Sequence, residues 1–284
     1  IPDRSTVMSV LPGQRMVMEG RGIMALKTRL LSAIIAALIS CVLFVASLDF
    51  FPVVFGIIRS WMGHILLGIS VLFIFRSRSP AGALAAFILS GMLGWFSMNS
   101  GMVDPFLPLF CGMFAIAAIS NYKKSHAPEQ LDLAVPVLGM DIFIPIIIGI
   151  ALGLFADLIP GIGSPGQVAA FATMLLPIGT MGYLALISSL SVSQAVFSFA
   201  TTASIDKSRV GATAWLAGLI DVKENLALIL ILFILAIAIG ASAAFLLRRY
   251  AARLASVDWT ILNPIIVAYL ISITFVIDGL SGLA

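Results

Sequence analysis

The feature that most constrains this chain is the length of its apolar runs. Residues 226–247 contain no charged side chain, and a helix of that length, at about 1.5 Å per residue, crosses the roughly 30 Å hydrocarbon core of a bilayer. Of the 284 residues, 61% are hydrophobic and 10% charged, against about 25% charged in an ordinary soluble domain. So few charges exclude a water-soluble enzyme or nucleic-acid-binding protein. The sequence predicts an all-α polytopic membrane protein.

The charge balance and the cysteines narrow the class further. The formal net charge is +3, and the basic residues are scattered, so we expect the lipid bilayer of the cell (plasma or inner) membrane, and no nucleic acid, as the partner. Cys41 and Cys111 lie in separate apolar runs, and we interpret both as packing residues. We expect no metal and no cofactor.

Seven apolar segments are predicted to span the membrane. Residues 30–48 and 61–75 form the first two, joined by a short connector at 49–60. The other five are residues 80–98, 105–119, 181–203, 226–247 and 261–277.

The basic residues predict the orientation of these spans, because cytoplasmic loops are enriched in lysine and arginine. Basic clusters in the leader (1–29), around Arg76 and Arg78, and at Lys123 and Lys124 are each separated by two spans. They therefore share one face, which places the leader in the cytoplasm. Arg248 and Arg249 reach that face only if residues 142–176 and 210–220 do not cross. The first is interrupted by PGIGSPG (160–166) and predicts a re-entrant hairpin, while the second is too short to cross. The C-terminus is then outside.

A weak internal repeat agrees with this assignment of crossing and non-crossing segments. EGRGIMAL (19–26) and SRVGATAW (208–215) share Gly-x-x-Ala in register and fall on opposite predicted faces. This arrangement is typical of inverted-repeat transporters. We therefore divide the chain into the remainder of repeat 1 (1–75), a central span pair with a cytoplasmic loop (76–140), and repeat 2 (141–284), which holds the hairpin, a broken span and two further spans.

The proline- and glycine-rich segment is the first candidate binding site. Its prolines and glycines break the helix, and irregular backbone at membrane depth survives where it is buried or lines a cavity. A helix that restarts near Pro165 would present free backbone N–H groups and a positive dipole end to an anion. The alternative is a plain turn at the membrane surface. The candidate substrate-binding residues here are Pro160, Gly161, Gly163, Ser164, Gly166 and Gln167.

A polar stretch, SSLSVSQAVFSFATTAS (188–204), is the second candidate. Ser191, Ser193 and Gln194 could unwind this span and bind a ligand or Na⁺. The alternative is interhelical packing by small hydroxyl residues, which contributes about 1 kcal/mol or less per residue.

Three carboxylates border the later spans. Asp141 and Asp157 flank the first arm of the hairpin, and Asp278 ends the last span. An ionisable residue at membrane depth indicates function, although a carboxylate at a segment end is also ordinary at the interface. Asp157 is the candidate for ion coupling. The chain has no HExxH motif and no paired intramembrane aspartates, and GIGSPG is not a GxSG protease motif, so we expect no enzyme activity.

These residues together resemble the TctA family, the large membrane subunit of tripartite tricarboxylate transporters, and within it the archaeal-type branch. The resemblance implies tricarboxylate uptake with an external solute-binding protein and a small second membrane subunit. It covers essentially the whole chain, and the hairpin is its most specific element. It is carried by Pro2, Thr6, Pro12, Gly13, Gly22, Ala25 and Leu26 of the leader, by LSGMLGWFSMN (89–99) with DPFLPLFCGMFAI (104–116), by IPIIIGIALGLFADLIPGIGSPGQ (144–167) and by DKSRVGA (206–212).

Two departures from the family pattern lead to a further expectation. The family has a first PG hairpin upstream of the leader-like segment, whereas this chain begins at Ile1 without one. We therefore expect an N-terminally truncated chain. The alternative is a half-transporter that completes its site as a homodimer. The branch also often carries Asn where this chain has Gln194.

The sequence thus predicts a secondary transporter permease for a small organic anion, with a di- or tricarboxylate as the expected substrate. Transport would be driven by Na⁺ or H⁺. The rival hypothesis is a membrane scaffold that transports nothing, in which the glycines only pack.

Overall fold

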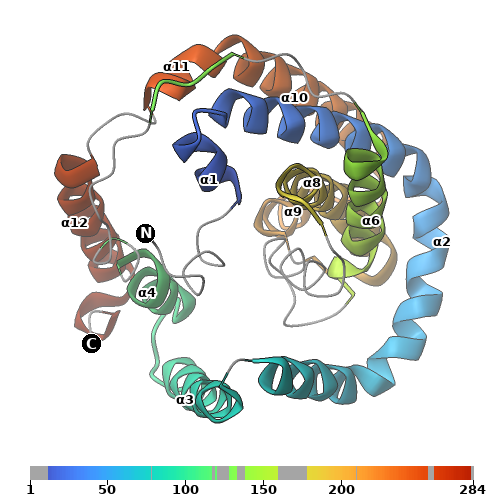
Figure 1. Cartoon of the computed structure of the whole chain (residues 1–284). Coiled ribbons are helices and arrows are strands. Elements are labelled where there is room, and N and C mark those ends of the chain that lie inside the picture. The colour runs from blue at the N-terminus through green and yellow to red at the C-terminus, as the bar shows by residue number, and fades with distance from the viewer. Residues whose placement is uncertain are drawn as a thin grey trace. The chain divides into compact units, whose positions relative to one another are not determined.

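The computed structural model of the chain describes residues 12–77, 79–116, 119, 128–132, 138–158, 178–208, 210–254 and 259–282. Every regular element in these ranges is a helix, which confirms the all-α prediction (Figure 1). Five helices in the described part are long and apolar enough to cross a membrane: Gly22–Arg76, Pro80–Met98, Thr180–Ile205, Leu226–Leu246 and Leu262–Gly282.

The chain forms two compact units. Unit 1 contains residues 1–66 and 127–255, and unit 2 contains residues 67–126 and 256–284. The three predicted segments of the repeat (1–75, 76–140 and 141–284) describe a relation between sequences and not compact units, so they stay a prediction.

Helix α8 (Thr180–Ile205) is the central element of unit 1. In its most apolar stretch 78% of the residues are buried, against 6% for helix α10 (Leu226–Leu246). Helix α8 contacts α1 (Pro12–Met18), α6 (Met140–Ala156), α9 (Gly211–Ala217) and α10. The remaining elements of the unit are the first part of α2 (Gly22–Arg76) and helix α11 (Arg248–Leu254).

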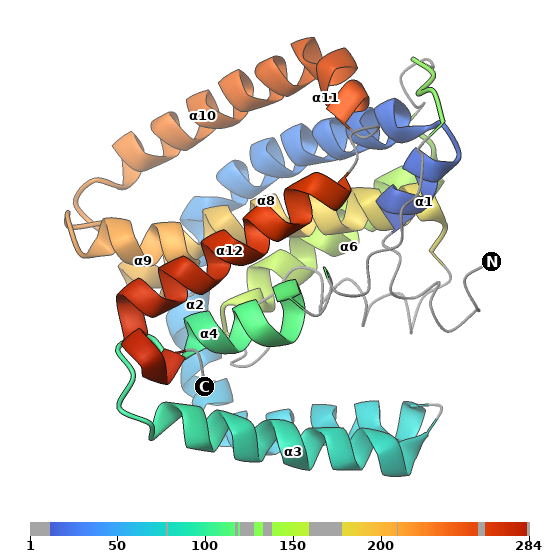
Figure 2. The ribbon, with the colours of Figure 1, turned by 90° about the vertical axis from the view of Figure 1, so that its left-hand side faces the viewer.

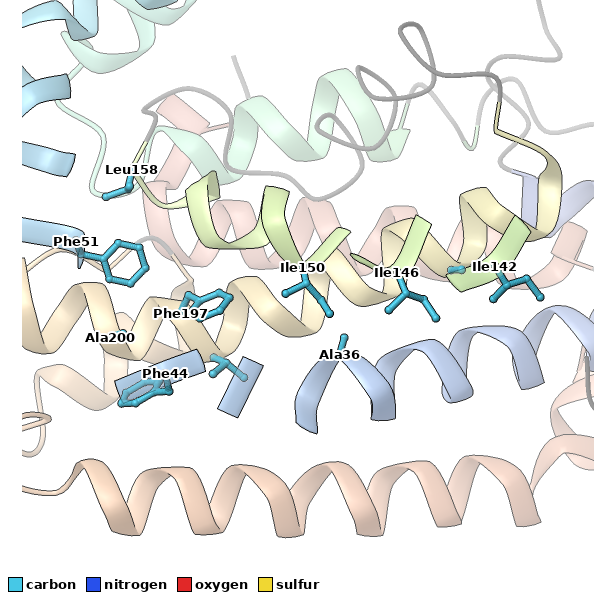
Figure 3. Packing of buried hydrophobic residues seen from close by; sticks show 11 residues of the cluster. Ala36, Phe44, Phe51, Ile142, Ile146, Ile150, Leu158, Phe197 and Ala200 are labelled. Carbon is cyan, nitrogen blue, oxygen red and sulfur yellow. The ribbon is translucent and has the colours of Figure 1, made fainter. Parts of the chain in front are cut away.

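The core of unit 1 is built from α2, α6 and α8. Aromatic side chains of α2, Phe44 and Phe51, lie against Phe197 of α8, and the rings of Phe51 and Phe197 meet edge to face at 6.2 Å (Figure 3). Ile146 of α6 is fully buried in the same cluster. Aromatic rings bury a large apolar area and prefer this geometry, so they fix how α2 lies on α8.

Helix α2 corrects one prediction. The expected spans at 30–48 and 61–75 are not separated by an irregular connector, because residues 49–60 continue the helix with Pro52 inside it. Proline removes one backbone hydrogen bond and crowds the preceding turn, so it bends a helix without always ending it. The neighbouring residue Phe51 is fully buried in the core, and this packing holds the chain helical through the proline.

The short elements agree with part of the span prediction and correct another part. Helix α9 has seven residues, too few to cross a membrane, as its length predicted. The fourth predicted span, 105–119, is not one long helix in the described residues. It begins as helix α4 (Phe106–Phe110) and continues as a π-helical turn η1 (Cys111–Ile116).

Unit 2 contains α3 (Pro80–Met98), α4, η1, α12 (Trp259–Asp278) and a terminal 3₁₀ turn η2 (Gly279–Gly282). Helix α3 begins with Pro80 in its first turn and with the Ser79 hydroxyl accepting a hydrogen bond from the backbone N–H of Gly82. Asp278 ends α12, and one of its carboxylate oxygens accepts a hydrogen bond from the backbone N–H of Asp104 at 2.9 Å.

Candidate functional site

Close packing of α6 on α8 positions the site. The two helices approach where α6 carries Gly149 and Gly153 and α8 carries Ser189 and Ser193. A Cβ atom on Gly149 would lie 2.6 Å from the carbonyl oxygen of Leu186, and a Cβ atom on either glycine would clash with the hydroxyl of the facing serine. Small residues spaced by four on facing helices are the usual means by which membrane helices bring their backbones together.

Asp157 lies directly after the last residue of α6, against α8. Only 1% of its surface is exposed. One carboxylate oxygen accepts a hydrogen bond from Nε2 of Gln194 at 3.0 Å, and the other lies 3.4 Å from the hydroxyl of Thr201. The sequence placed this carboxylate at a segment end, where an interfacial position is ordinary, but in the structure it is buried and bonded to α8.

The α8 side of this cluster is a polar stripe. Gln194, Ser198 and Thr201 are spaced by four and three residues, so they lie on one face of the helix. The Ser198 hydroxyl is fully buried and has no hydrogen-bond partner among the described residues. Sequence analysis singled out Gln194 but missed Ser198 and Thr201, although their helical spacing from Gln194 was a signal that could have found them.

Ser191 and Ser193 do not break α8. The Ser191 hydroxyl donates to the carbonyl oxygen of Ile187 at 2.7 Å, and the Ser193 hydroxyl donates to the carbonyl oxygen of Ser189 at 2.6 Å. Both therefore bond to their own helix, as serines in helix interiors commonly do. The expectation of a broken span is wrong for this reason, because α8 runs without interruption from Thr180 to Ile205.

Six predicted substrate-binding residues lie outside the described residues: Pro160, Gly161, Gly163, Ser164, Gly166 and Gln167. What the structure does describe is the entry to this segment. Leu158, which precedes it, is 1% exposed and packs in the core of unit 1. The last described residues before this segment, Asp157 and Leu158, are therefore both buried in unit 1.

A second polar feature of unit 1 is a cavity of about 460 Å³ between α1, α2 and α8. Arg29, Gln14 and Tyr183 supply its polar side chains. Arg29 also donates from Nε to the Ser188 hydroxyl at 3.2 Å, which ties α2 to α8. Sequence analysis used Arg29 only to orient the leader.

The cluster around Asp157 has the chemistry of a cation or proton site. In the described ranges no lysine or arginine forms an ion pair with Asp157. The hydrogen-bond partners of its carboxylate there are the Gln194 amide and the Thr201 hydroxyl. Carboxylate and hydroxyl oxygens are the ligands that hard cations prefer. No group of three or more His, Cys, Asp or Glu residues that could hold a transition metal occurs among the described residues.

Comparison with known proteins gives one match. The family model described as the tripartite tricarboxylate transporter TctA family matches residues 1–283. No curated protein and no solved structure matches the chain.

Proposed function

The chain belongs to the TctA family of tripartite tricarboxylate transporters, and from this membership we propose that it is a permease that couples the uptake of a small organic anion to Na⁺ or H⁺. It is an integral membrane protein and a transporter component, not a member of an enzyme family. We propose a di- or tricarboxylate as its substrate.

The observation that carries the proposal is the buried Asp157. A buried carboxylate that no lysine or arginine among the described residues neutralises is costly inside an apolar helix bundle, and proteins retain it where it serves a function. A proton or a Na⁺ ion bound between Asp157, Ser198 and Thr201 would neutralise the charge. Binding of that cation would then stabilise Asp157 in its buried position between α6 and α8.

The substrate would bind near the start of the PG segment. Its backbone N–H groups, with Ser164, Gln167 and Gln194, are the proposed anion ligands, and they follow Asp157 directly in the chain. Arg29, in its cavity against α8, adds a fixed positive charge that favours a carboxylate in the same unit.

Tripartite transporters of this family work with a solute-binding protein and a small second membrane subunit, and we propose both as partners here. The solute-binding protein would deliver the carboxylate from outside.

The test is uptake of labelled citrate and related acids into proteoliposomes that contain the full-length protein and its two partners. We expect Asp157→Asn, which keeps the shape but removes the charge, to lower coupled uptake at least about tenfold, equivalent to ~1.4 kcal/mol. Imposing a Na⁺ gradient or a pH gradient separately identifies the coupling ion.

The matched control is Asp141→Asn, because Asp141 is an exposed carboxylate at the other end of the same helix. We expect uptake by this variant within about twofold of the parent protein, since surface charges contribute little. Equal uptake by the parent and the Asp157→Asn variant, with both folded, would show that Asp157 does not couple transport.

A further inference from the structure

A groove between α2 and α10 is distinct from the site around Asp157. It has a volume of about 650 Å³, and its walls are Leu30, Ile34 and Leu38 of α2 and Ile234, Ala238 and Ala241 of α10. Figures 1 and 2 show α10 running beside the first part of α2. The rest of the lining is apolar too, apart from Lys27 and Ser242.

The groove exists because α10 is held to the unit mainly at its beginning. Ile229 is 5% exposed, and the ring of Phe233 meets Phe199 of α8 at 6.4 Å. Most of the later large side chains of α10, among them Leu235 and Ile239, are exposed. In a membrane protein such a surface faces acyl chains, so lipid has direct access to the groove.

Positive charge gathers at one end of the groove. Nζ of Lys27, which lines the groove, donates to Asp132 at 2.7 Å. Arg248 and Arg249 approach the other oxygen of the same carboxylate at 3.2 and 3.6 Å. Three cations thus share one carboxylate, Asp132, among the described residues. The Arg249 side chain is 74% exposed, so it can reach a further anion.

The charged end is joined directly to the apolar walls. The Arg248 guanidinium lies 4.3 Å from the centre of the Phe245 ring, and Phe245 lines the groove. Along α10 the lining extends from Ile234 to Leu246, a rise of about 18 Å, and along α2 from Leu30 to Leu38, about 12 Å. Half of the hydrocarbon core is about 15 Å thick. The groove therefore matches one acyl chain in one leaflet, with the cations at headgroup level.

We propose that this groove binds one anionic glycerophospholipid, with an acyl chain along α2 and α10 and its phosphate on Lys27, Arg248 and Arg249. Basic pockets between membrane helices on the cytoplasmic side favour anionic headgroups, and these three residues belong to the clusters that the sequence assigns to that side. Arginine contributes directed donors to a phosphate, and lysine adds a point charge. The site ties α10, which has few other contacts, to α2.

The test is native mass spectrometry of the full chain with phosphatidylglycerol and with phosphatidylcholine of identical acyl chains. We expect one phosphatidylglycerol to bind at least about tenfold more tightly than phosphatidylcholine. Arg249→Gln should lower the affinity for phosphatidylglycerol about fivefold, the effect of one basic residue near a charged lipid headgroup, and leave phosphatidylcholine unchanged. Lys223→Gln is the matched control, because Lys223 is an exposed cation at the opposite end of α10.

A second pair of variants tests the apolar part. Ala238→Phe fills the groove and should weaken both lipids, whereas Ala236→Phe, on an exposed part of α10 outside the groove lining, should weaken neither. Equal affinity for the two lipids, or an equal loss in Lys223→Gln, would overturn the proposal. Stabilisation of the protein by inorganic phosphate alone would overturn it as well. So would binding of a second copy of the chain in the groove. None of these measurements depends on transport, so they test the lipid site independently of the proposed transport function.

Discussion

At the scale of single residues, Asp157 depends on two side chains from a neighbouring helix. Gln194 and Thr201 each meet one of its carboxylate oxygens, and both come from α8. A carboxylate so buried keeps its charge only through such contacts or by binding a cation. Its neighbours on α8 should therefore set how tightly the coupling ion binds.

We predict that Thr201→Val weakens ion coupling. Valine keeps the shape of threonine but removes the hydroxyl, and leaving a buried charged group without one partner costs about 1–3 kcal/mol. The concentration of coupling ion that gives half-maximal uptake should rise at least about fivefold. Thr202→Val is the control, because the Thr202 hydroxyl donates to the carbonyl of Ser198 and not to Asp157. The same rise in both variants would refute a specific role for Thr201.

A second residue prediction concerns Asp132 and pH. The hydrogen bond from the Lys27 ammonium lowers the pKa of the Asp132 carboxyl below its ordinary value of 3.8. A lowered pKa means that the ionised form is favoured in the folded protein, so its stabilisation is present above about pH 3.8 and is lost as the pH falls through the lowered pKa. We expect the melting temperature to fall over this interval, and to fall less in Asp132→Asn. An equal fall of the melting temperature in the two proteins between pH 5 and about pH 3 would contradict this.

At the scale of elements, the sequence predicts helices well and predicts their continuity poorly. The apolar runs identify α3, α8, α10 and α12 closely. Whether Pro52 ends α2 or only bends it depends on Phe51, which packs into a core formed by distant segments. In the same way, the serines of α8 could have broken the helix or bonded to its carbonyl oxygens, and the structure shows the second for Ser191 and Ser193.

The contact between α6 and α8 gives the element-scale prediction. Gly149→Ala places a Cβ within 2.6 Å of the Leu186 carbonyl, so backbone must move, and such overpacking costs about 1–3 kcal/mol. Gly240→Ala in α10 is the control, because a Cβ there meets nothing within 4 Å. It should be neutral or stabilise by up to about 1 kcal/mol. Thermal unfolding in detergent measures both. Equal melting temperatures for the two variants would show that the helices are less tightly packed than described.

At the scale of the whole molecule, the sequence predicted the all-α membrane class and the family, because both depend on composition and on motifs spread over the chain. The burial of Asp157 could not be predicted in this way. It follows from the packing of α8 along α6, a long-range contact that no local pattern encodes. The orientation in the membrane still depends on the distribution of basic residues alone.

Cysteine labelling tests this orientation. In a background without Cys41 and Cys111, a membrane-impermeant thiol reagent added outside should label Arg59→Cys and not Arg78→Cys. The basic loops define the cytoplasmic face, and Arg59 is predicted to lie on the other one. The pair is informative because α2 is helical from Gly22 to Arg76, whereas the predicted orientation has the chain turn back within these residues. Labelling of Arg78→Cys from outside would reverse the predicted topology.

The glycine–serine contact between α6 and α8 has a mechanical consequence. Two helices whose backbones interlock this closely cannot slide past each other without a clash, because packed interfaces switch between discrete arrangements and do not deform continuously. Asp157 and its partners on α8 would then travel as a single rigid body during a transport cycle. The hinge of that cycle would then lie outside the α6–α8 pair.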